Sequence, residues 1–307
     1  MYFPFMRGKQ YEFLSILEMS KIIKNRANVI PIIEPIKISK LNSGYLRKIS
    51  KEGIPVIIIS NPLVGELKND NSSIKKEIIS IFDKNNLIVA YQITKGTTIL
   101  DIKNFKNEYN GFKICYIHLE TNNDNEFLNK FNSIDGIELN ILNINDLSSG
   151  YIEAIMRSFN NCVLLSDGFK KEKRNADYPK ESSLSNLMFN YKNKGAIGYS
   201  DYLTVGEKYE EINSAPYAIA IHYSIVRNQA VFVKHYISDT NKTQKDQAGK
   251  FLEAIKKFKK DYDLNNYIKT IGTKQLIDYY NSQHYPGLGK IKQISMEHHI
   301  EVIANII

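Results

Sequence analysis

The sequence predicts an α/β protein, a (β/α)8 barrel of the TIM-barrel type with an extra C-terminal β-hairpin and helices. Eight short β-rich runs recur along the chain with helical patterns between them. Most of these runs are continuously apolar, as in VIPII, PVIIIS and CVLLS, which is typical of parallel strands covered on both faces. No Gly-rich dinucleotide-binding motif follows any of them, which disfavours the main alternative, a doubly wound open sheet.

The eight predicted strands follow one another with a helical segment after each. They are Tyr2–Met6, Val29–Glu34, Pro55–Ser60, Leu87–Ile93, Lys113–Leu119, Ile137–Leu142, Cys162–Asp167 and Ala196–Asp201. The chain has 307 residues, and a barrel of this kind needs about 250. Strand followed by helix, repeated eight times, therefore indicates a closed barrel.

The segments between the strands carry apolar residues at helical spacing. In 9–24, Phe13 and Leu17 lie on one face, and in 73–84 the stripe contains Ile74, Ile78 and Ile81. Both segments are expected to be helices that cover the barrel.

The pattern changes after Asp201. The segments 217–226 and 230–238, separated by Arg227, Asn228 and Gln229, read as an antiparallel hairpin. A basic amphipathic helix is predicted over 244–260, with six Lys against one Asp and one Glu, and a last helix over 294–307. Because no linker divides the chain, we expect one domain over 1–307, with the barrel in 1–215 and the elaboration in 216–307.

Composition bounds the class of protein. Hydrophobic residues make up 43% and charged residues 24%, which is ordinary for a globular chain. The 41 basic residues exceed the 33 acidic ones and give a net charge of +8, which favours polyanionic partners such as nucleic acid or phosphate-bearing ligands. AT-rich coding is the alternative source of the many lysines.

The cellular compartment is predicted from cysteines and hydropathy. Cys115 and Cys162 each lie in a predicted buried strand, where a thiol behaves as a small apolar residue. No stretch is apolar enough for a signal peptide or a membrane span. We therefore expect a cytoplasmic protein without a membrane partner.

Polar residues cluster at the predicted carboxyl ends of the strands, the face on which barrel enzymes build their sites. They are Arg7, Lys9, Glu34, Asn61, Gln92, His118, Glu120, Asn140, Asp167 and Asp201. The opposite ends begin with apolar residues such as Val29 and Leu87. This asymmetry predicts a functional site at the barrel mouth; the alternative is that strands simply run into polar loops.

The loop 166–179, SDGFKKEKRNADYP, follows the seventh strand. Barrels often bind phosphate between the seventh and eighth loops, and Arg174 has the fork geometry to hold it, with Lys173 as a point charge. Arg7 and Lys9 would converge on the same mouth, because first and eighth strands are neighbours. A solvated surface loop is the alternative.

Carboxylates and histidines are the candidate catalytic groups. Glu34, Glu120, Asp167 and Asp201 could hold Mg²⁺, or instead neutralise nearby cations in buried ion pairs. Asp167, Asp201 and Glu34 could also move protons. His118 and His222 have side chains that titrate near neutrality, although a satisfied core histidine is the more common case. The metal and cofactor stay unassigned. No CxxC pair, HExxH, P-loop or GxSxG motif occurs, which excludes the common zinc modules, metalloproteases, P-loop hydrolases and α/β-hydrolases.

Several short motifs in a fixed order carry a family resemblance. MYFPFMRGKQYEFL, IPIIEPI, SDGF with RNADY, GYSDY and the IHYSIV hairpin together resemble the Beta protein family, named for a product of phage-satellite Gop-Beta-Cll cassettes. The closing HYPGLGKIKQISMEHHIE is similar to a branch of that family found beside predicted nucleases in bacterial genomes. The residues within matching motifs are Arg7, Lys9, Glu34, Asp167, Arg174, Asn175, Asp177, Asp201 and Tyr202.

The resemblance implies a barrel-like fold and a role in antiviral defence of bacteria, acting with a nuclease encoded nearby. It implies no catalytic mechanism.

Two hypotheses for the function follow. In the first, the barrel mouth binds a phosphate-bearing ligand, nucleic acid or a nucleotide, and hydrolyses it. The catalytic candidates are then Asp167, Asp201, Glu34 and His118, and the ligand-binding candidates Arg7, Lys9, Lys173, Arg174, Asn175, Asp177, Tyr202 and His222. In the second, the chain is a non-catalytic recognition or scaffold subunit that binds nucleic acid or the partner nuclease, with the lysine-rich 244–260 helix holding polyanion.

Overall fold

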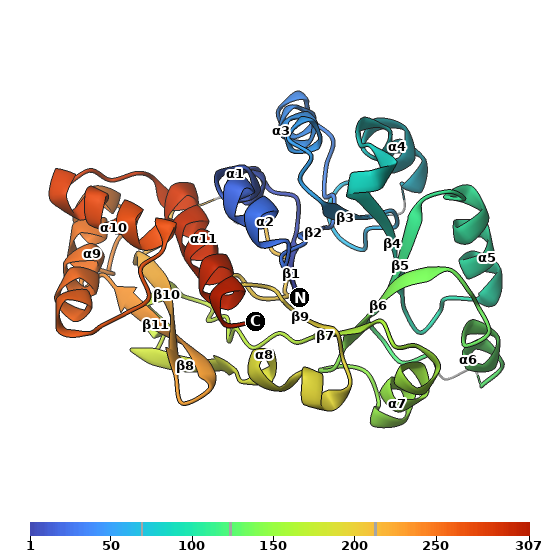
Figure 1. Ribbon diagram of the computed structural model, residues 1–307. Helices are drawn as coiled ribbons and strands as arrows, with labels where there is room; N and C mark the ends of the chain where they lie inside the picture. The colour runs from blue at the N-terminus through green and yellow to red at the C-terminus, as the bar shows by residue number, and fades with distance from the viewer. Residues whose placement is uncertain (69, 123–124, 212–213) are drawn as a thin grey trace. The chain divides into compact units, whose positions relative to one another are not determined.

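The computed structural model describes residues 1–68, 70–122, 125–211 and 214–307 (Figure 1). The chain divides into two compact units, one formed by Met1–Ser166 with Asn190–Asp201 and the other by Asp167–Phe189 with Tyr202–Ile307. The segment 167–189, expected within the barrel part, therefore clusters with the C-terminal residues. Each unit is described by itself.

The N-terminal unit is a closed barrel of eight parallel strands, which confirms the predicted fold class. In order around the barrel they are β1 (Tyr2–Met6), β2 (Ile32–Ile33), β3 (Val56–Ile59), β4 (Leu87–Ile93), β5 (Lys113–His118), β6 (Ile137–Asn143), β7 (Cys162–Leu165) and β9 (Gly198–Asp201). The last strand pairs in parallel with both β7 and β1 and so closes the barrel. Strand β2 is shorter than predicted, because Pro31 and Pro35 flank it and proline has no N–H for the ladder.

Helices follow most strands and lie outside the barrel (Figure 1). They are α1 (Gln10–Glu18), α2 (Ser20–Arg26), α3 (Lys40–Lys51), α4 (Asn71–Glu77), α5 (Ile99–Glu108), α6 (Asn125–Phe131) and α7 (Ser149–Ser158). A short helix, α8 (Leu187–Asn190), precedes β9 in the chain. Two predicted helices differ from expectation. The segment 9–24 breaks at Met19 into two helices, and the segment 73–84 leaves the α-helix at Glu77 and continues as 3₁₀ turns.

Side chains on β1 and β5 identify the two faces of the barrel wall. The ring of Tyr116 packs against Phe105 of α5 and Phe131 of α6, so its face of β5 looks toward the helices. Neighbouring residues on a strand point to opposite faces, and Ile117 therefore faces the barrel interior. The strand pairings from β5 through β6, β7 and β9 to β1 place Tyr2 on the same helix-facing side as Tyr116, so the next residue, Phe3, faces the interior.

The C-terminal unit contains an antiparallel sheet in the order β10-β11-β8, formed by β8 (Glu181–Ser185), β10 (Ala220–Arg227) and β11 (Ala230–Ile237). The predicted hairpin is confirmed. Asn228 and Gln229 make its two-residue turn with φ of 51° and 53°, as a type I′ turn requires. Strand β8 was not predicted.

The described residues of this unit also form the helices α9 (Gln247–Leu264), α10 (Ile271–Ser282) and α11 (Leu288–Ile306). The apolar faces of these helices pack with β10 into one hydrophobic core. Its residues include Tyr223 of β10 and Phe251 and Phe258 of α9. Helices α9 and α11 correspond to the predicted 244–260 and 294–307 helices, and α11 starts earlier, at Leu288.

Candidate functional site

Polar side chains from four consecutive strands meet inside the barrel at its carboxyl end. Phe5 pairs with Ile32, so the next residues on that face, Arg7 and Glu34, point toward the interior. Gln92 pairs with Ile117 and shares its inward direction. Together with Asn61, which follows β3, these residues form what we call the mouth cluster: Arg7, Glu34, Asn61 and Gln92.

Glu34 is the centre of the mouth cluster. Its side chain is fully buried and forms an ion pair with Arg7, whose side chain keeps 12% of its surface exposed. The second carboxylate oxygen accepts the backbone N–H of Leu63 at 2.7 Å and the amide of Gln92 at 3.0 Å. A buried carboxylate with this many donors is held in one orientation.

Gln92 joins the last two strands of the cluster. Its Nε2 donates to Glu34 and, at 3.2 Å, to the carbonyl oxygen of Asn61, while Asn61 exchanges two hydrogen bonds with the backbone of Gln92. Because both partners of the Gln92 amide group are acceptors, the NH₂ must face them and Oε1 must point elsewhere. That oxygen is buried and has no hydrogen-bond partner within the described part of the chain.

Glu12, which sequence reasoning missed, lies next to the mouth cluster at the start of α1. Its carboxylate accepts the backbone N–H of Lys9 at 2.9 Å and caps the helix. Burial raises the pKa of Glu12, and hydrogen bonds and charges from Lys9 and Arg7 oppose that rise without cancelling it. The sequence signal that could have identified Glu12 was its position as the third residue of a helix that directly follows a strand end.

Asp201 lies on the opposite face of the barrel wall from Arg7 and Glu34. Phe3 pairs with Ser200, so Ser200 shares the inward face and Asp201 points toward the helix layer. There it accepts a 2.7 Å hydrogen bond from the hydroxyl of Tyr2. Burial and this carboxylate raise the pKa of Tyr2 well above its usual value. The structure thus does not bring Asp201 into the mouth cluster.

His118 also faces the helices. Its Nδ1 lies 2.9 Å from the hydroxyl of Tyr151 and its Nε2 lies 3.2 Å from Oδ1 of Asn140. The amide oxygen can only accept, so Nε2 carries the proton and Nδ1 accepts from the tyrosine. Burial lowers the pKa of His118 to about 4. Both ring nitrogens are occupied, which is the arrangement of a satisfied core histidine.

The remaining predicted residues belong to the C-terminal unit, where Asp167 organises its own loop. Its two carboxylate oxygens accept backbone N–H groups from Phe169 at 3.1 Å and from Glu207 at 2.8 Å. The next residue, Gly168, has no room for a side chain, because a Cβ there would lie 2.0 Å from the carbonyl oxygen of Leu184. The SDGF motif therefore specifies a tight loop conformation.

The cationic loop residues are engaged within the same segment. Arg174 donates to both oxygens of Asp177, at 2.9 and 2.7 Å, and Asn175 donates to the carbonyl oxygen of Ala218 at 2.7 Å. Lys173 is exposed, and Tyr202 is buried with 2% of its surface accessible. That this loop covers the barrel mouth stays a prediction.

His222 pairs with a second histidine that was not predicted, His235. Their Nδ1 atoms lie 2.8 Å apart, and the other ring nitrogen of His235 lies 2.8 Å from the hydroxyl of Ser182. The rings of Phe169 and Tyr178 pack against the pair. One Nδ1 must donate and the other accept, so the two Nδ1 atoms cannot both carry a proton in this arrangement. Burial lowers the pKa of His222 to about 3, with a further contribution from His235.

The predicted lysine-rich helix is less cationic on its surface than the sequence indicates. Lys250 is buried and its ammonium group contacts the carbonyl oxygen of Thr243. Lys257 and Lys259 form ion pairs with Asp239 and Asp263. Three of the six lysines are thus engaged within the protein.

Among the described residues, no three His, Cys, Asp or Glu side chains are grouped as metal ligands. The carboxylates proposed for Mg²⁺ are held instead by Arg7, by Tyr2 and by backbone amides. Within the same described residues, no helix combines the length and apolar character needed to cross a bilayer.

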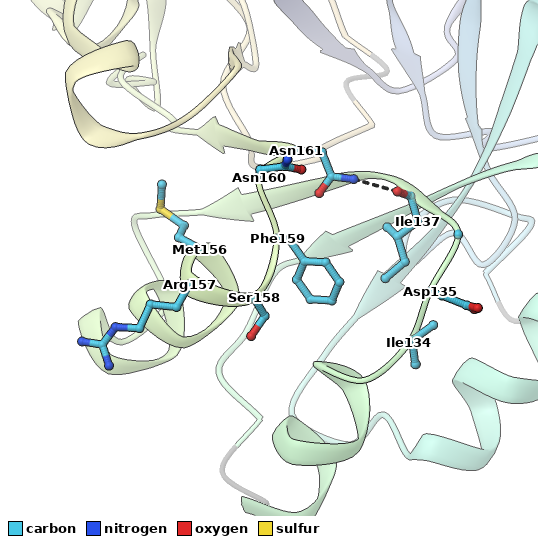
Figure 2. Close-up of a pocket in the computed structure, with 10 residues that line it drawn as sticks. Ile134, Asp135, Ile137, Met156, Arg157, Ser158, Phe159, Asn160 and Asn161 are labelled. Carbon is cyan, nitrogen blue, oxygen red and sulfur yellow. Dashed lines mark hydrogen bonds between the residues drawn. The ribbon is translucent and has the colours of Figure 1, made fainter.

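A cavity of about 410 Å³ opens at the amino ends of β6 and β7 (Figure 2). Asn161 beside it donates to the carbonyl oxygen of Ile137 at 2.7 Å, and Arg157 pairs with Glu153 of its own helix. Barrel enzymes build their sites at the other end of the strands, so we assign this cavity to the structural side of the fold.

No protein-family model, curated protein or solved structure matches this chain. The resemblance to the Beta protein family accordingly stays a prediction.

Proposed function

We propose that the carboxyl-end mouth of the barrel binds a small phosphate-bearing ligand. The observation that carries this proposal is the mouth cluster itself. Barrel interiors are otherwise filled by apolar side chains, and a buried polar network stabilises a fold less well than apolar packing of the same volume. The buried Oε1 of Gln92 has no partner among the described residues, and a ligand that completes the network best explains it.

Three groups at the mouth favour an anion. Arg7 is partly exposed beside Glu34, Lys9 follows it by two residues, and the first turn of α1 begins at Gln10. The amino end of a helix presents backbone N–H groups and a positive dipole end, to which phosphate groups bind. Guanidinium and ammonium groups provide the charge-assisted hydrogen bonds.

The free oxygen of Gln92 adds a second requirement, because it can only accept. The ligand should therefore bring an N–H or O–H donor into the barrel while its anionic part faces Arg7 and Lys9. A nucleotide has both features, and so does a nucleic-acid end.

Hydrolysis of that ligand is a second candidate, favoured by the environment of Glu12. Burial raises the pKa of this carboxyl group, whereas Glu34 nearby is held in an ion pair with Arg7. Two carboxyl groups in such different surroundings can divide the roles of proton donor and charged base. Water would attack the phosphorus while Glu34 takes its proton, the bond between phosphorus and the leaving oxygen would break, and Glu12 would donate a proton to that oxygen.

The biological setting in this proposal is bacterial defence against phage, together with a partner nuclease. It is supported by the ordered motifs that resemble the Beta protein family. If the chain binds the ligand without turnover, it acts as the recognition subunit and the partner supplies the chemistry.

Binding can be tested by titrating the purified protein with nucleotides, and with short DNA and RNA, at two salt concentrations. Lys9→Met keeps the backbone N–H that Glu12 accepts and removes one cation, so we expect about tenfold weaker binding. Lys51→Met at the other end of the barrel, on α3, is the matched control and should change nothing. Equal affinities of the parent protein and Lys9→Met would refute the phosphate site.

Turnover is tested separately with the same ligands, with and without Mg²⁺ or Mn²⁺. Product formed by the parent protein and lost in Glu12→Gln, with binding retained, supports the hydrolytic role. Binding without product in any sample assigns the chain to recognition.

A further inference from the structure

A second cavity, of about 440 Å³, lies wholly within the C-terminal unit. Tyr178 and Lys180 line it from the segment before β8, Lys234 and Tyr236 from β11, and Lys257 from α9. Three lysines around one small cavity are an unusual concentration of positive charge. None of these residues belongs to the mouth cluster.

Asp261, the acidic residue in the wall of the cavity, already accepts its hydrogen bonds from protein donors and not from a ligand. Oδ2 of Asp261 receives hydrogen bonds from Lys234 at 2.7 Å, Tyr236 at 2.6 Å and Tyr267 at 2.9 Å, and Oδ1 receives one from Asn265 at 3.0 Å. Burial raises the pKa of Asp261, but these donors outweigh burial and hold its pKa below the ordinary value. The Asp261 carboxylate is therefore ionised and saturated by protein donors.

The lysines differ in how far they are neutralised. Lys234 is balanced by Asp261, and Lys257 bonds to the carbonyl oxygen of Ile237 at 2.6 Å and to Asp239 at 2.7 Å. The side chain of Asp239 is 78% exposed, so water weakens that pair. Lys180 is exposed and has no ion-pair partner among the residues that the structure describes. The cavity thus keeps an excess of positive charge.

His235 contributes to the wall of the cavity without adding charge. Its ring nitrogens are engaged by Ser182 and His222, and burial lowers its pKa to about 4. Near pH 7 the imidazole is neutral, and the attraction for an anion comes from the lysines. The ring of Tyr178 stacks on His235 with centroids 4.7 Å apart, which fixes this wall.

We propose that this cavity is a separate binding site for a compact oxyanion, such as the phosphate group of a small ligand, held by Lys180 and Lys257. The site goes beyond the barrel-mouth function and does not rest on it. Because ammonium groups act as point charges, they recognise phosphate whether it is free or part of a nucleotide. The experiment below separates these two sources.

The test is isothermal titration of the full-length protein at pH 7.5 and constant ionic strength. The probes are inorganic phosphate, sulfate, AMP and adenosine. Lys180→Met is the main variant, because the exposed side chain can be replaced without disturbing the fold. Lys257→Met is the second variant, and Lys274→Met, an exposed lysine of α10 outside the cavity, is the matched control.

We expect the parent protein to bind phosphate and sulfate, and Lys180→Met to bind them about five- to tenfold more weakly. Lys274→Met should bind as the parent does, and adenosine should not compete. If AMP binds more tightly than phosphate, and this AMP binding is weakened by Lys180→Met but not by Lys9→Met, the ligand of the cavity is a nucleotide. Equal affinities for AMP and phosphate identify the free anion.

Equal phosphate affinity in the parent, Lys180→Met and Lys257→Met would overturn the proposal, as would the absence of saturable binding to the parent. The two sites are distinguished by Lys9→Met, which should leave this binding event unchanged. Failure of the barrel-mouth proposal would therefore not remove the loss caused by Lys180→Met.

Discussion

Burial of His118 makes the stability of the barrel depend on pH, and the size of the effect follows from its surroundings. The folded protein holds the pKa of His118 at about 4, against about 6.5 for an exposed histidine. Between these two values the unfolded chain binds a proton that the folded protein does not. The contribution of His118 is therefore fully present above pH 6.5 and is lost as the pH falls toward 4.

The difference between the folded and unfolded pKa of His118 gives the size of the change in unfolding free energy with pH. Lowering the pH from 7.5 to 5.0 should cost about 2 kcal/mol of unfolding free energy through His118 alone. His118→Gln removes the titrating group, so this variant should lose about 2 kcal/mol less than the parent protein over the same interval. Other buried histidines titrate equally in both proteins and cancel in the comparison.

Urea unfolding followed by circular dichroism at the two pH values measures the four free energies needed. His284→Gln, at an exposed histidine, is the matched control and should show the pH dependence of the parent. If His118→Gln and the parent protein lose the same stability between pH 7.5 and 5.0, the reasoning about a neutral, hydrogen-bonded core histidine is refuted.

Two further predictions concern the loop and the ion pair. Gly168→Ala should destabilise the protein by about 1–3 kcal/mol, because the new Cβ would meet the carbonyl oxygen of Leu184, whereas Gly96→Ala has open space and should be nearly neutral; thermal unfolding compares them. Arg7→Met should cost about 3–5 kcal/mol in urea unfolding by leaving Glu34 buried and unpaired. The double variant Arg7→Met with Glu34→Gln should recover most of that loss, and a double variant as unstable as the single one would contradict the assignment.

The candidate site was partly predictable. Arg7, Glu34, Asn61 and Gln92 all follow from the rule that parallel strands end at one edge of a barrel, and the structure brings them together. Glu12 was missed because it is a helix residue. Its burial depends on how α1 folds back beside the strand end, which one-dimensional spacing does not contain.

His118 and Asp201 show why strand ends alone are insufficient. Neighbouring residues on a strand point to opposite sides of the wall, so a shift of one position decides between interior and helix layer. His118 directly follows the inward-facing Ile117, and Asp201 directly follows Ser200. Only the pairing register tells which residue of each pair lines the mouth.

Strand β8 illustrates a second limit. Its sequence ESSLS has one apolar residue and no β-branched or aromatic side chain, so local preference does not predict a strand. It forms because the edge of β11 offers backbone partners, with Val233 opposite Ser182 and Lys234 opposite Glu181. Pairing with a partner strand outweighs weak intrinsic preference.

By itself, the sequence determined the barrel, the hairpin and the end of the barrel at which polar groups gather, because apolar periodicity and strand–helix alternation are local properties of the chain. Tertiary structure alone decided which polar side chains face inward, that Gln92 donates to Glu34, and that three lysines distant in sequence surround one cavity. These depend on contacts between residues far apart in the chain, whose geometry exists only after folding.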